Sequence, residues 1–408
     1  MKSFVVAVFL IILAVCAKAQ NEAECQDGLE WARKGADPLA DFTVLLYGSI
    51  SSSESDKNIV FSPVSISLAL AQLKVGSDGD TSSQMRYLLV KRGANESYVR
   101  GIYEALQRQL LRSSQPDCAQ LKIVNGIYHQ PAISMKQEYL RAIRECFDGK
   151  IDQCNFQSDA AGCRDMINDW VANNTANKIP QLFQGDAIKR DSLIVLASAI
   201  YFKAAWYETF PSPLVSTSEF YRFGREDEEQ MVQYLTNEDQ YLFYQTNSVS
   251  VVGIPYKGYD FYMYVILPKK RDGLEEFERT FTGTELMFLI NRTTEREVEV
   301  KIPKFKIRTR VDLKPVFVSL GLGDMFSERA NFSRMTDSKV FVDSAAHETF
   351  IDVNESGTEA AGATGLAIRP MSARPIPIPF VANHPFFYAI VHQPTHAIIF
   401  AGKVMYID

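Results

Sequence analysis

The sequence predicts an α+β fold, with helices in the first half of the chain and antiparallel strands in the second. Apolar residues recur at helical spacing over 63–76, 97–111 and 135–147. The later segments are instead rich in β-branched and aromatic residues, which favour strands. Helices and strands that are segregated in this way are typical of an α+β fold and not of alternating α/β units.

The first of these helices is delimited at both ends. Ser62 is a favourable N-cap residue and Pro63 suits the first helical turn, while the apolar run stops near Gly76. A strand-like stretch at 121–128 lies between the second and third helices. One strand is therefore expected among the early helices.

Three later stretches predict further strands, and the C-terminus predicts a hairpin. The strands are expected at 194–206, 250–267 and 297–308. In the last of them the apolar alternation changes phase across Pro303, which indicates a bulge or a bend. Two strand-like segments, 385–390 and 397–404, then flank a turn near Pro394.

The N-terminus has the pattern of a secretory signal peptide. Lys2 precedes an apolar run over 4–15, and an A-x-A cleavage motif ends at Ala19. We therefore expect residues 1–19 to be removed and the protein to be secreted into the extracellular space. The run is too short for a membrane anchor, and no later stretch has eighteen uninterrupted apolar residues, so no membrane partner is expected.

Residues 20–408 are expected to form a single domain, because no linker, repeat or low-complexity tract divides them. Loss of residues 1–19 removes two lysines and no acid from 43 basic and 49 acidic residues, which leaves a net charge of −8. This balance gives no sign of nucleic-acid binding. We expect a monomer without a cofactor or a metal ion.

Five cysteines remain after removal of the signal peptide. They are Cys25, Cys118, Cys146, Cys154 and Cys163. An odd number leaves at least one thiol unpaired within the chain, and the sequence does not determine the pairing. Because a chain of this length can build a large core, any disulfide is expected to be an accessory constraint.

Glycosylation sequons fit a secreted protein. The candidate sites are Asn95, Asn173, Asn291 and Asn331, and several sequons are expected to be unused. A fifth sequon, at Asn354, is expected to stay unoccupied, because a glycan there would crowd the segment that follows.

One segment of about 25 residues late in the chain fits neither a helix nor a strand pattern. Residues 355–365 are small or polar, and Pro375, Pro377 and Pro379 stiffen the far side. Loops of this length inside a compact domain are commonly functional, although the composition alone also fits a flexible linker. We expect an exposed functional loop over 357–379.

Six motifs resemble those of the serpin family of serine protease inhibitors, over nearly the whole mature chain. They begin at Asn58 (NIVFSPVSI), Tyr201 (YFKAAW), Ile254 (IPYKG), Ile302 (IPKFKI), Gly357 (GTEAAGA) and Phe380 (FVANHPFFYAI). The resemblance implies a serpin fold with three β-sheets, roughly nine helices and a reactive-centre loop at 357–379. It also implies that a target protease attacks the loop, which inserts into the main sheet and traps the covalent acyl-enzyme.

The resemblance assigns three groups of residues to loop insertion. The hinge, which enters the sheet first, comprises Gly357, Thr358, Glu359, Ala360, Ala361, Gly362 and Ala363. The shutter, where the main sheet opens, comprises Ser62, Ser65, Ser198 and His347. The breach, next to the hinge, comprises Trp206, Lys304 and Glu355, and an ion pair is expected between Lys304 and Glu355.

One shutter position departs from the family pattern. Ser198 stands where the family usually has asparagine. The shorter hydroxyl is expected not to reach His347, so that opening of the main sheet would be controlled differently.

The bait bond is expected between Met371 and Ser372. Counting forward from Gly357 by the usual family spacing leads to Met371, whereas counting back from Pro385 leads to Arg374. Arg374 precedes a proline, as does the other nearby arginine, and proline hinders attack at that bond. Methionine suits a hydrophobic specificity pocket, which predicts elastase-, cathepsin G- or chymotrypsin-like targets.

Three other functions fit the sequence less well. A non-inhibitory serpin, acting as a carrier, chaperone or storage protein, often has bulky, charged or proline residues where this hinge is small. An enzyme is not expected, because no nucleophile elbow or phosphate-binding loop is present, and a proline between His392 and His396 predicts a turn instead of a zinc-binding helix. A heparin-binding inhibitor is the third alternative, and it is only weakly supported because Arg100, Arg108 and Arg112 are sparse on their predicted helix.

Overall fold

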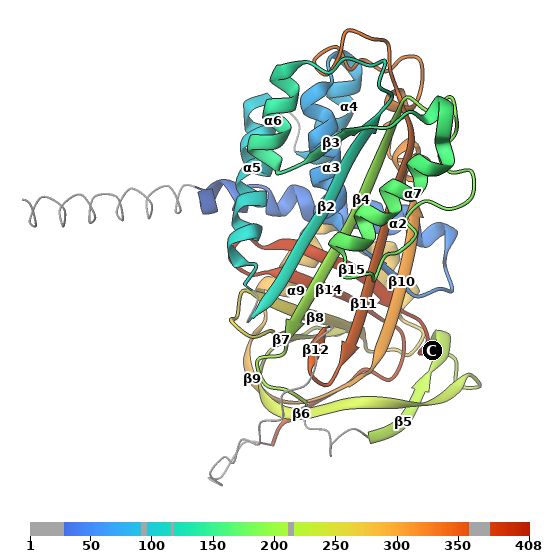
Figure 1. Ribbon diagram of the computed structural model, residues 1–408. Coiled ribbons are helices and arrows are strands. Elements are labelled where there is room, and N and C mark those ends of the chain that lie inside the picture. The colour runs from blue at the N-terminus through green and yellow to red at the C-terminus, as the bar shows by residue number, and fades with distance from the viewer. Residues whose placement is uncertain (1–27, 91–95, 116–117, 211–215, 359–375) are drawn as a thin grey trace, which may run out of the picture.

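The structure, a computed structural model, describes residues 28–90, 96–115, 118–210, 216–358 and 376–408. Over these residues the chain forms nine α-helices with defined bounds and two hydrogen-bonded β-sheets (Figure 1). The predicted α+β class is confirmed. The predicted signal peptide lies outside the described residues, as do Cys25, Asn95, most of the hinge and the bait bond.

The main sheet has six strands in the order β10-β11-β12-β4-β2-β3. Their bounds are β2 (Ala119–His129), β3 (Lys150–Gln153), β4 (Ile194–Ala205), β10 (Phe305–Asp312), β11 (Val342–Asn354) and β12 (Gly357–Thr358). Strands β4 and β11 are parallel and pair directly only as far as Ile200 and Thr349. Beyond that point the two-residue strand β12 lies between them and is antiparallel to both. The seam between β4 and β11 is thus closed at one end and occupied by β12 at the other.

The second sheet has nine strands. Their bounds are β1 (Ile59–Phe61), β5 (Ser216–Tyr221), β6 (Glu229–Gln245), β7 (Val249–Pro255), β8 (Phe261–Pro268), β9 (Thr294–Pro303), β13 (Ile378–Val381), β14 (Phe386–His392) and β15 (Ala397–Val404). Strand β6 pairs with β5 and β9 over most of its length and with β7 at its end. Because the long strand β6 pairs with β5 and β9 and also with β7, the second sheet is continuous here, whereas the family resemblance implies two separate sheets in its place.

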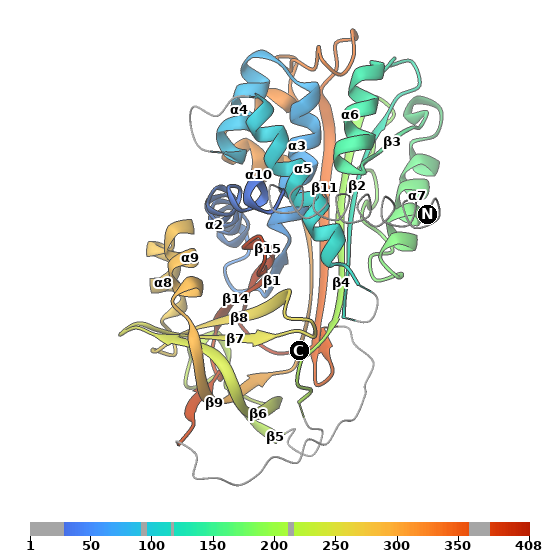
Figure 2. The same cartoon turned by 90° about the vertical axis from the view of Figure 1, so that its left-hand side faces the viewer.

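Helices cover both faces of the main sheet, while α8 and α9 lie beside the second sheet (Figure 2). Their bounds are α2 (Ala36–Ser53), α3 (Pro63–Gly76), α4 (Gly79–Leu89), α5 (Glu96–Ser113), α6 (Gln137–Phe147), α7 (Phe156–Asn174), α8 (Leu274–Thr280), α9 (Gly283–Asn291) and α10 (Leu313–Ser319). Helix α7 packs on one face through its own apolar cluster, which includes Phe156, Ile167 and Val171. The other face belongs to the large core, where α3 is buried on nearly all sides.

Aromatic side chains connect the two sheets. Phe202 projects from β4, and its ring centroid lies 5.3 Å from those of Tyr256 and Phe261 and 5.9 Å from that of Phe400. Large buried aromatic rings contribute much of the apolar area that stabilises a core. The two sheets therefore share one hydrophobic core.

Several sequence-predicted elements are confirmed with small shifts at their ends. Helix α3 spans the expected residues, and the Ser62 side chain accepts a hydrogen bond from the backbone N–H of Ser65. The strand expected over 250–267 is divided into β7 and β8. The expected bend at Pro303 is a change of sheet, because β9 ends there and β10 begins in the main sheet at Phe305.

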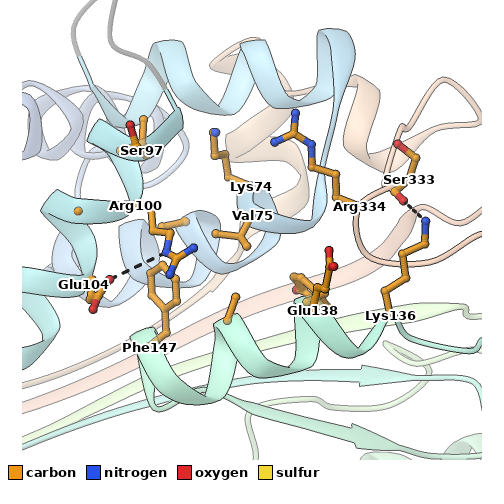
Figure 3. A pocket seen from close by; sticks show the side chains of 15 residues that line it. Lys74, Val75, Ser97, Arg100, Glu104, Lys136, Glu138, Phe147, Ser333 and Arg334 are labelled. Carbon is orange, nitrogen blue, oxygen red and sulfur yellow. Dashed lines mark hydrogen bonds and ion pairs between the residues drawn. The ribbon is translucent and has the colours of Figure 1, made fainter.

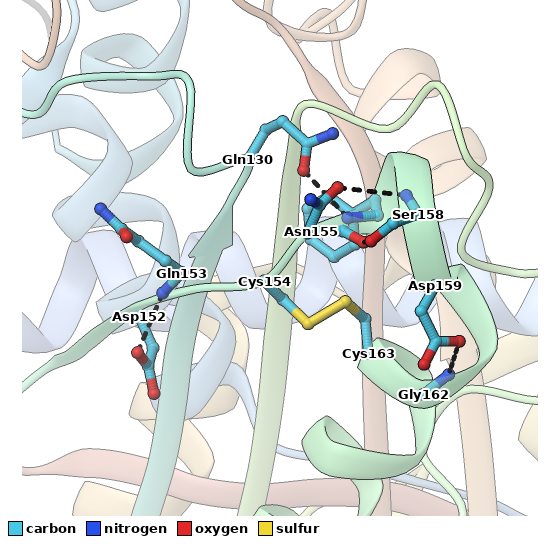
Figure 4. The surroundings of a disulfide bond; sticks show 10 residues. Gln130, Asp152, Gln153, Cys154, Asn155, Ser158, Asp159, Gly162 and Cys163 are labelled. Atoms are coloured by element: carbon cyan, nitrogen blue, oxygen red, sulfur yellow. Dashed lines mark hydrogen bonds between the residues drawn. A yellow bond between two sulfur atoms is a disulfide. The ribbon is translucent and has the colours of Figure 1, made fainter.

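A disulfide joins Cys154, which follows β3, to Cys163 in α7 (Figure 4). Cys118 is partly exposed and Cys146 is buried, and both are free thiols. Nearby, Asn155 caps α7 by accepting a hydrogen bond from the N–H of Ser158. The disulfide and the cap together fix the start of α7 over the main sheet.

We predict that Cys163→Ser lowers the free energy of unfolding by roughly 2–3 kcal/mol, which is the loop-closure entropy for a disulfide across a short loop. The measurement is urea unfolding of the oxidised protein. The matched control is Cys118→Ser, which removes a free thiol and should change the free energy of unfolding by less than about 0.5 kcal/mol. Equal losses in both variants would contradict a stabilising disulfide.

Candidate functional site

The shutter residues meet at the closed end of the seam. His347 on β11 lies opposite Ser198 on β4, with Nδ1 3.1 Å from the Ser198 Oγ. The His347 Nε2 is 3.0 Å from the backbone N of Ser62 and 2.7 Å from the Thr349 Oγ1. Because the Ser62 N–H can only donate, Nε2 accepts and Nδ1 carries the proton that is donated to Ser198. One buried imidazole thus connects β4, β11 and the start of α3.

The expectation that Ser198 falls short of His347 was wrong. The parallel register sets the two residues side by side, so the short hydroxyl reaches the ring at 3.1 Å. The same hydroxyl is 3.1 Å from the Ser65 Oγ, which extends the network to α3. The serine therefore links the histidine to the helix without an amide group.

Sequence reasoning missed Asn125, which completes the network from β2. Its amide nitrogen donates to the backbone carbonyl of Ser65 at 3.0 Å, and its carbonyl oxygen is 3.3 Å from the Ser65 Oγ. The side chain is buried. The available signal was an asparagine between the apolar residues Val124 and Ile127 of a predicted strand, since a buried amide needs hydrogen-bond partners.

Burial holds His347 in its neutral form. Desolvation lowers the pKa of His347 to about 3, although a hydrogen bond with the Ser198 backbone acts in the opposite direction. A neutral imidazole can accept at one nitrogen and donate at the other, as the network requires. Protonation would remove the acceptor that the Ser62 N–H uses.

The breach residues surround the other end of the seam. The indole N–H of Trp206 donates to the backbone carbonyl of Asn354 at 2.9 Å, and its ring stacks on Tyr256 with centroids 4.4 Å apart. The ion pair expected between Lys304 and Glu355 is present at 3.1 Å. Burial raises the pKa of Glu355, but hydrogen bonds from its own backbone and from Lys304 outweigh that effect, so the pKa is lowered.

The first two hinge residues lie in the sheet as β12. Gly357 has a φ of +147°, and a Cβ atom there would lie 2.1 Å from the carbonyl oxygen of Ala204. Thr358 is buried, with its Oγ1 2.6 Å from the Tyr256 hydroxyl oxygen. Glycine is therefore required at position 357. Tyr256 holds Thr358 in place, although sequence reasoning did not assign Tyr256 to the hinge.

The remaining predicted positions differ in their surroundings. Asn173, Asn291 and Asn331 are exposed, whereas Asn354 is half-buried and its side-chain oxygen accepts from the Ser356 N–H at 3.0 Å.

Arg100 and Arg108 on α5 both lie near the carboxylate of Glu104. Residues 393–396 form the predicted turn, and no group of histidine, cysteine and acidic residues in the described part of the chain could hold a metal ion.

Comparisons with known proteins agree with this architecture. A family model described as Serpin (serine protease inhibitor) matches residues 37–407. Human serpin I2 is 31% identical over 384 residues, which cover 92% of this chain and 93% of the relative. The leukocyte elastase inhibitor of Bos taurus is 30% identical over 376 residues, which cover 89% and 97%. The chain belongs to the serpin family.

Solved structures share the fold at lower sequence identity. Human thyroxine-binding globulin has a TM-score of 0.81 at 25% identity, and the match covers 92% of this chain and 99% of that one. That protein has been crystallised as a complex with thyroxine. Since proteins with this fold include both a named inhibitor and a thyroxine-binding protein, the fold alone does not decide between inhibition and transport.

No helix among the described residues is both long and apolar enough to cross a membrane.

We predict that acid weakens the fold through the two most deeply buried histidines. The pKa of His347 is lowered to about 3 by burial, and that of His392 is lowered to about 3 by burial and by His396. In the unfolded chain both titrate near 6.5, so the stability that they contribute is complete above that pH and is lost as the pH falls toward 3. Each contributes a slope of about 1.4 kcal/mol per pH unit.

The measurement is urea unfolding between about pH 4 and 7. In this range His347→Gln should reduce the slope of the unfolding free energy against pH by the contribution of one proton. The matched variant His392→Gln should flatten it equally while leaving the shutter contacts in place. An unchanged slope in His347→Gln would show that this ring takes up its proton in the folded protein.

Proposed function

We propose that this protein is a secreted serine protease inhibitor that consumes itself by trapping its target. The observation that carries the proposal is β12, because Gly357 and Thr358 already lie between β4 and β11. The rest of the loop would continue in the same direction along the seam. Secretion rests on the predicted signal peptide at 1–19 and on the exposed sequons.

Insertion would exchange one set of hydrogen bonds for a larger one. Strands β4 and β11 must separate, which breaks their direct pairing and the contact between Ser198 and His347. A new strand between them then pairs on both of its edges, and its inward side chains become buried. The gain in pairing and burial is the driving force that moves the attached protease.

The chemistry of the trap takes place at the bait bond. The protease serine oxygen attacks the carbonyl carbon of Met371, the bond to the Ser372 nitrogen breaks, and that nitrogen takes a proton. An ester joins the two proteins at this stage. Distortion of the protease by insertion prevents water from completing hydrolysis, so the complex persists.

The orientation of Thr358 fixes which hinge side chains face the interior in an inserted strand. Thr358 points to Tyr256 and is 1% exposed. Because strand side chains alternate, Ala360, Gly362 and Thr364 would also face inward, and Glu359 would face solvent. The inward positions are small and the single charge lies outward, as insertion requires.

The proposed targets are elastase-, cathepsin G- or chymotrypsin-like proteases. Their specificity pockets accept an apolar side chain such as Met371. A relative of this chain carries the name leukocyte elastase inhibitor, which supports the same target class. The alternative bait, Arg374, would direct the inhibitor to trypsin-like enzymes.

The mature protein, residues 20–408, forms one domain that acts as a monomer, needs no cofactor and is not itself an enzyme. Glycans are attached at some of the four candidate sites, Asn95, Asn173, Asn291 and Asn331. Heparin binding is only weakly supported, since Arg100 and Arg108 on α5 both lie beside Glu104.

The competing function is that of a non-inhibitory carrier, chaperone or storage protein. Thyroxine-binding globulin shares the fold, so this alternative has a structural precedent. The small hinge residues favour inhibition, because a carrier has no need of a segment that fits between two strands.

The test is incubation of the purified full-length protein with elastase, chymotrypsin and trypsin, followed by a denaturing gel. We expect an adduct that survives denaturation with elastase or chymotrypsin, and a released peptide that begins at Ser372. Cleavage without any adduct would contradict trapping. An adduct with trypsin and a released peptide that begins at Pro375 would move the bait to Arg374.

A matched pair of hinge variants tests the insertion itself. We predict that Ala360→Arg, which would bury a charge, abolishes the adduct and turns the protein into a substrate. Ala361→Arg adds the same charge on the outward face and should retain at least half of the adduct yield. Equal yields from the two variants would contradict insertion with the register set by Thr358.

A further inference from the structure

A small cleft of about 170 Å³ lies where the segment that follows β4 meets β6, β7, β8 and β9. Three tyrosines line it: Tyr207 from that segment, Tyr259 from the turn between β7 and β8, and Tyr262 from β8. None of its lining residues belongs to the hinge, the shutter or the breach. Drug-sized ligands occupy pockets of roughly 300–1,000 Å³, so this cleft fits only a small molecule or a single chemical group.

The three aromatic rings are accessible to a ligand. Tyr207 is 48% exposed, Tyr259 is 47% exposed and Tyr262 is half-buried. The ring centroids of Tyr207 and Tyr259 are 4.4 Å apart, and those of Tyr259 and Tyr262 are 6.3 Å apart, with a tilt of 43° within each pair. The rings therefore form one aromatic wall that is not flat.

Accessibility distinguishes this cleft from a pocket of about 670 Å³ among α3, α5 and α6 (Figure 3). In that pocket the basic residue Lys74 and the aromatic residue Phe147 are each 2% exposed. A ligand there could not reach the groups that would have to bind it. The tyrosines of the smaller cleft are, by contrast, in contact with solvent.

The backbone at Tyr259 has a conformation that bulky residues avoid. Its φ is +61°, in the left-handed region, and the preceding Gly258 has a φ of +95°. The turn is closed by a hydrogen bond of 3.0 Å from the Tyr259 N–H to the Tyr256 carbonyl. Residues held in such conformations cluster at functional sites, and here the conformation brings the Tyr259 ring beside Tyr207. This backbone strain is a second feature, independent of the exposed rings, that indicates a binding function.

The charged residues of the cleft are all acidic. Glu208, Asp239 and Glu295 line it, and no lysine, arginine or histidine does so among the described residues. Glu295, on β9, is exposed. Burial raises the pKa of Tyr262, and the negative charge of Glu295 raises it further. The field of this carboxylate therefore reaches the aromatic wall, so the cleft attracts cations.

We propose that the cleft binds a quaternary ammonium ion of the size of choline, with its methyl groups against Tyr207, Tyr259 and Tyr262 and with Glu295 as the counter-charge. The faces of aromatic rings carry partial negative charge and attract cations, and aromatic cages recognise quaternary ammonium groups in this way. Such an ion has no N–H group, so the rings can cover it without leaving a donor unpaired. A metal ion fits less well, because no group of histidine, cysteine and acidic residues in the described part of the chain could hold one.

The experiment is calorimetric titration of the full-length protein with choline chloride, at an ionic strength held constant with sodium chloride. We expect one saturable site per chain. The neutral alcohol 3,3-dimethyl-1-butanol has the shape of choline with carbon in place of nitrogen, and ethanolamine has a primary ammonium group without the methyl groups. Each should bind about tenfold more weakly than choline. The absence of saturable choline binding, or equal binding of either control compound, would overturn the proposal.

Variants at Tyr207 separate the aromatic ring from its hydroxyl group. Tyr207→Leu removes the ring and should weaken choline binding about tenfold, whereas Tyr207→Phe keeps the ring and should bind choline within about twofold of the unmodified protein. Because Tyr207 is half exposed, both variants should stay folded, which the thermal midpoint checks. Equal affinities in the two variants would show that the ring does not bind the cation.

Two further variants test the charge and the position of the site. Glu295→Gln keeps the shape of the side chain without its charge and should weaken choline binding about threefold. Tyr87→Leu removes a tyrosine on α4 that is 61% exposed and lies outside the cleft, and it should leave the affinity unchanged. Undiminished binding to Glu295→Gln, or a loss in Tyr87→Leu as large as in Tyr207→Leu, would overturn the site.

Discussion

One buried, neutral imidazole connects β4, β11 and the start of α3 at the closed end of the seam. His347 receives an N–H from the start of α3 and donates to Ser198 on the neighbouring strand. A buried donor without a partner destabilises a fold by about 1–3 kcal/mol, so separating the strands carries that cost unless new partners arrive with the inserting segment. In the proposed mechanism the histidine network would therefore resist opening of the main sheet.

The two ends of the same seam are in different states. At one end the strands are paired directly, and the polar network of Ser65, Asn125 and Ser198 supports the histidine. At the other end β12 separates them, and Trp206 and Tyr256 form its aromatic surroundings. A sheet that is already divided at one end needs only to extend an existing separation, which is easier than starting one in a continuous ladder.

The sequence predicted local features better than distant contacts. The cap at Ser62, the end of α3 at Gly76 and the bend at Pro303 were predictable, because each depends on a few adjacent residues. The reach of Ser198 was predicted wrongly, because it depends on the register between two strands that lie about 150 residues apart. Tyr256 was missed for the same reason: its role exists only where β12 comes beside it.

The passage of the chain from β9 through Lys304 to β10 has a consequence for the loop between β12 and β13. Strand β9 pairs with β13 on the far side of the loop, as in Val298 with Ile378, and Lys304 holds Glu355 on the near side. The backbone from β9 to Lys304 thus contacts the chain on both sides of the loop and fixes the distance between the two ends of the loop. If the loop is cut, these contacts remain, and the C-terminal piece stays bound through β13, β14 and β15. A nicked molecule therefore remains a single particle in solution, and only its two new chain ends are free to separate.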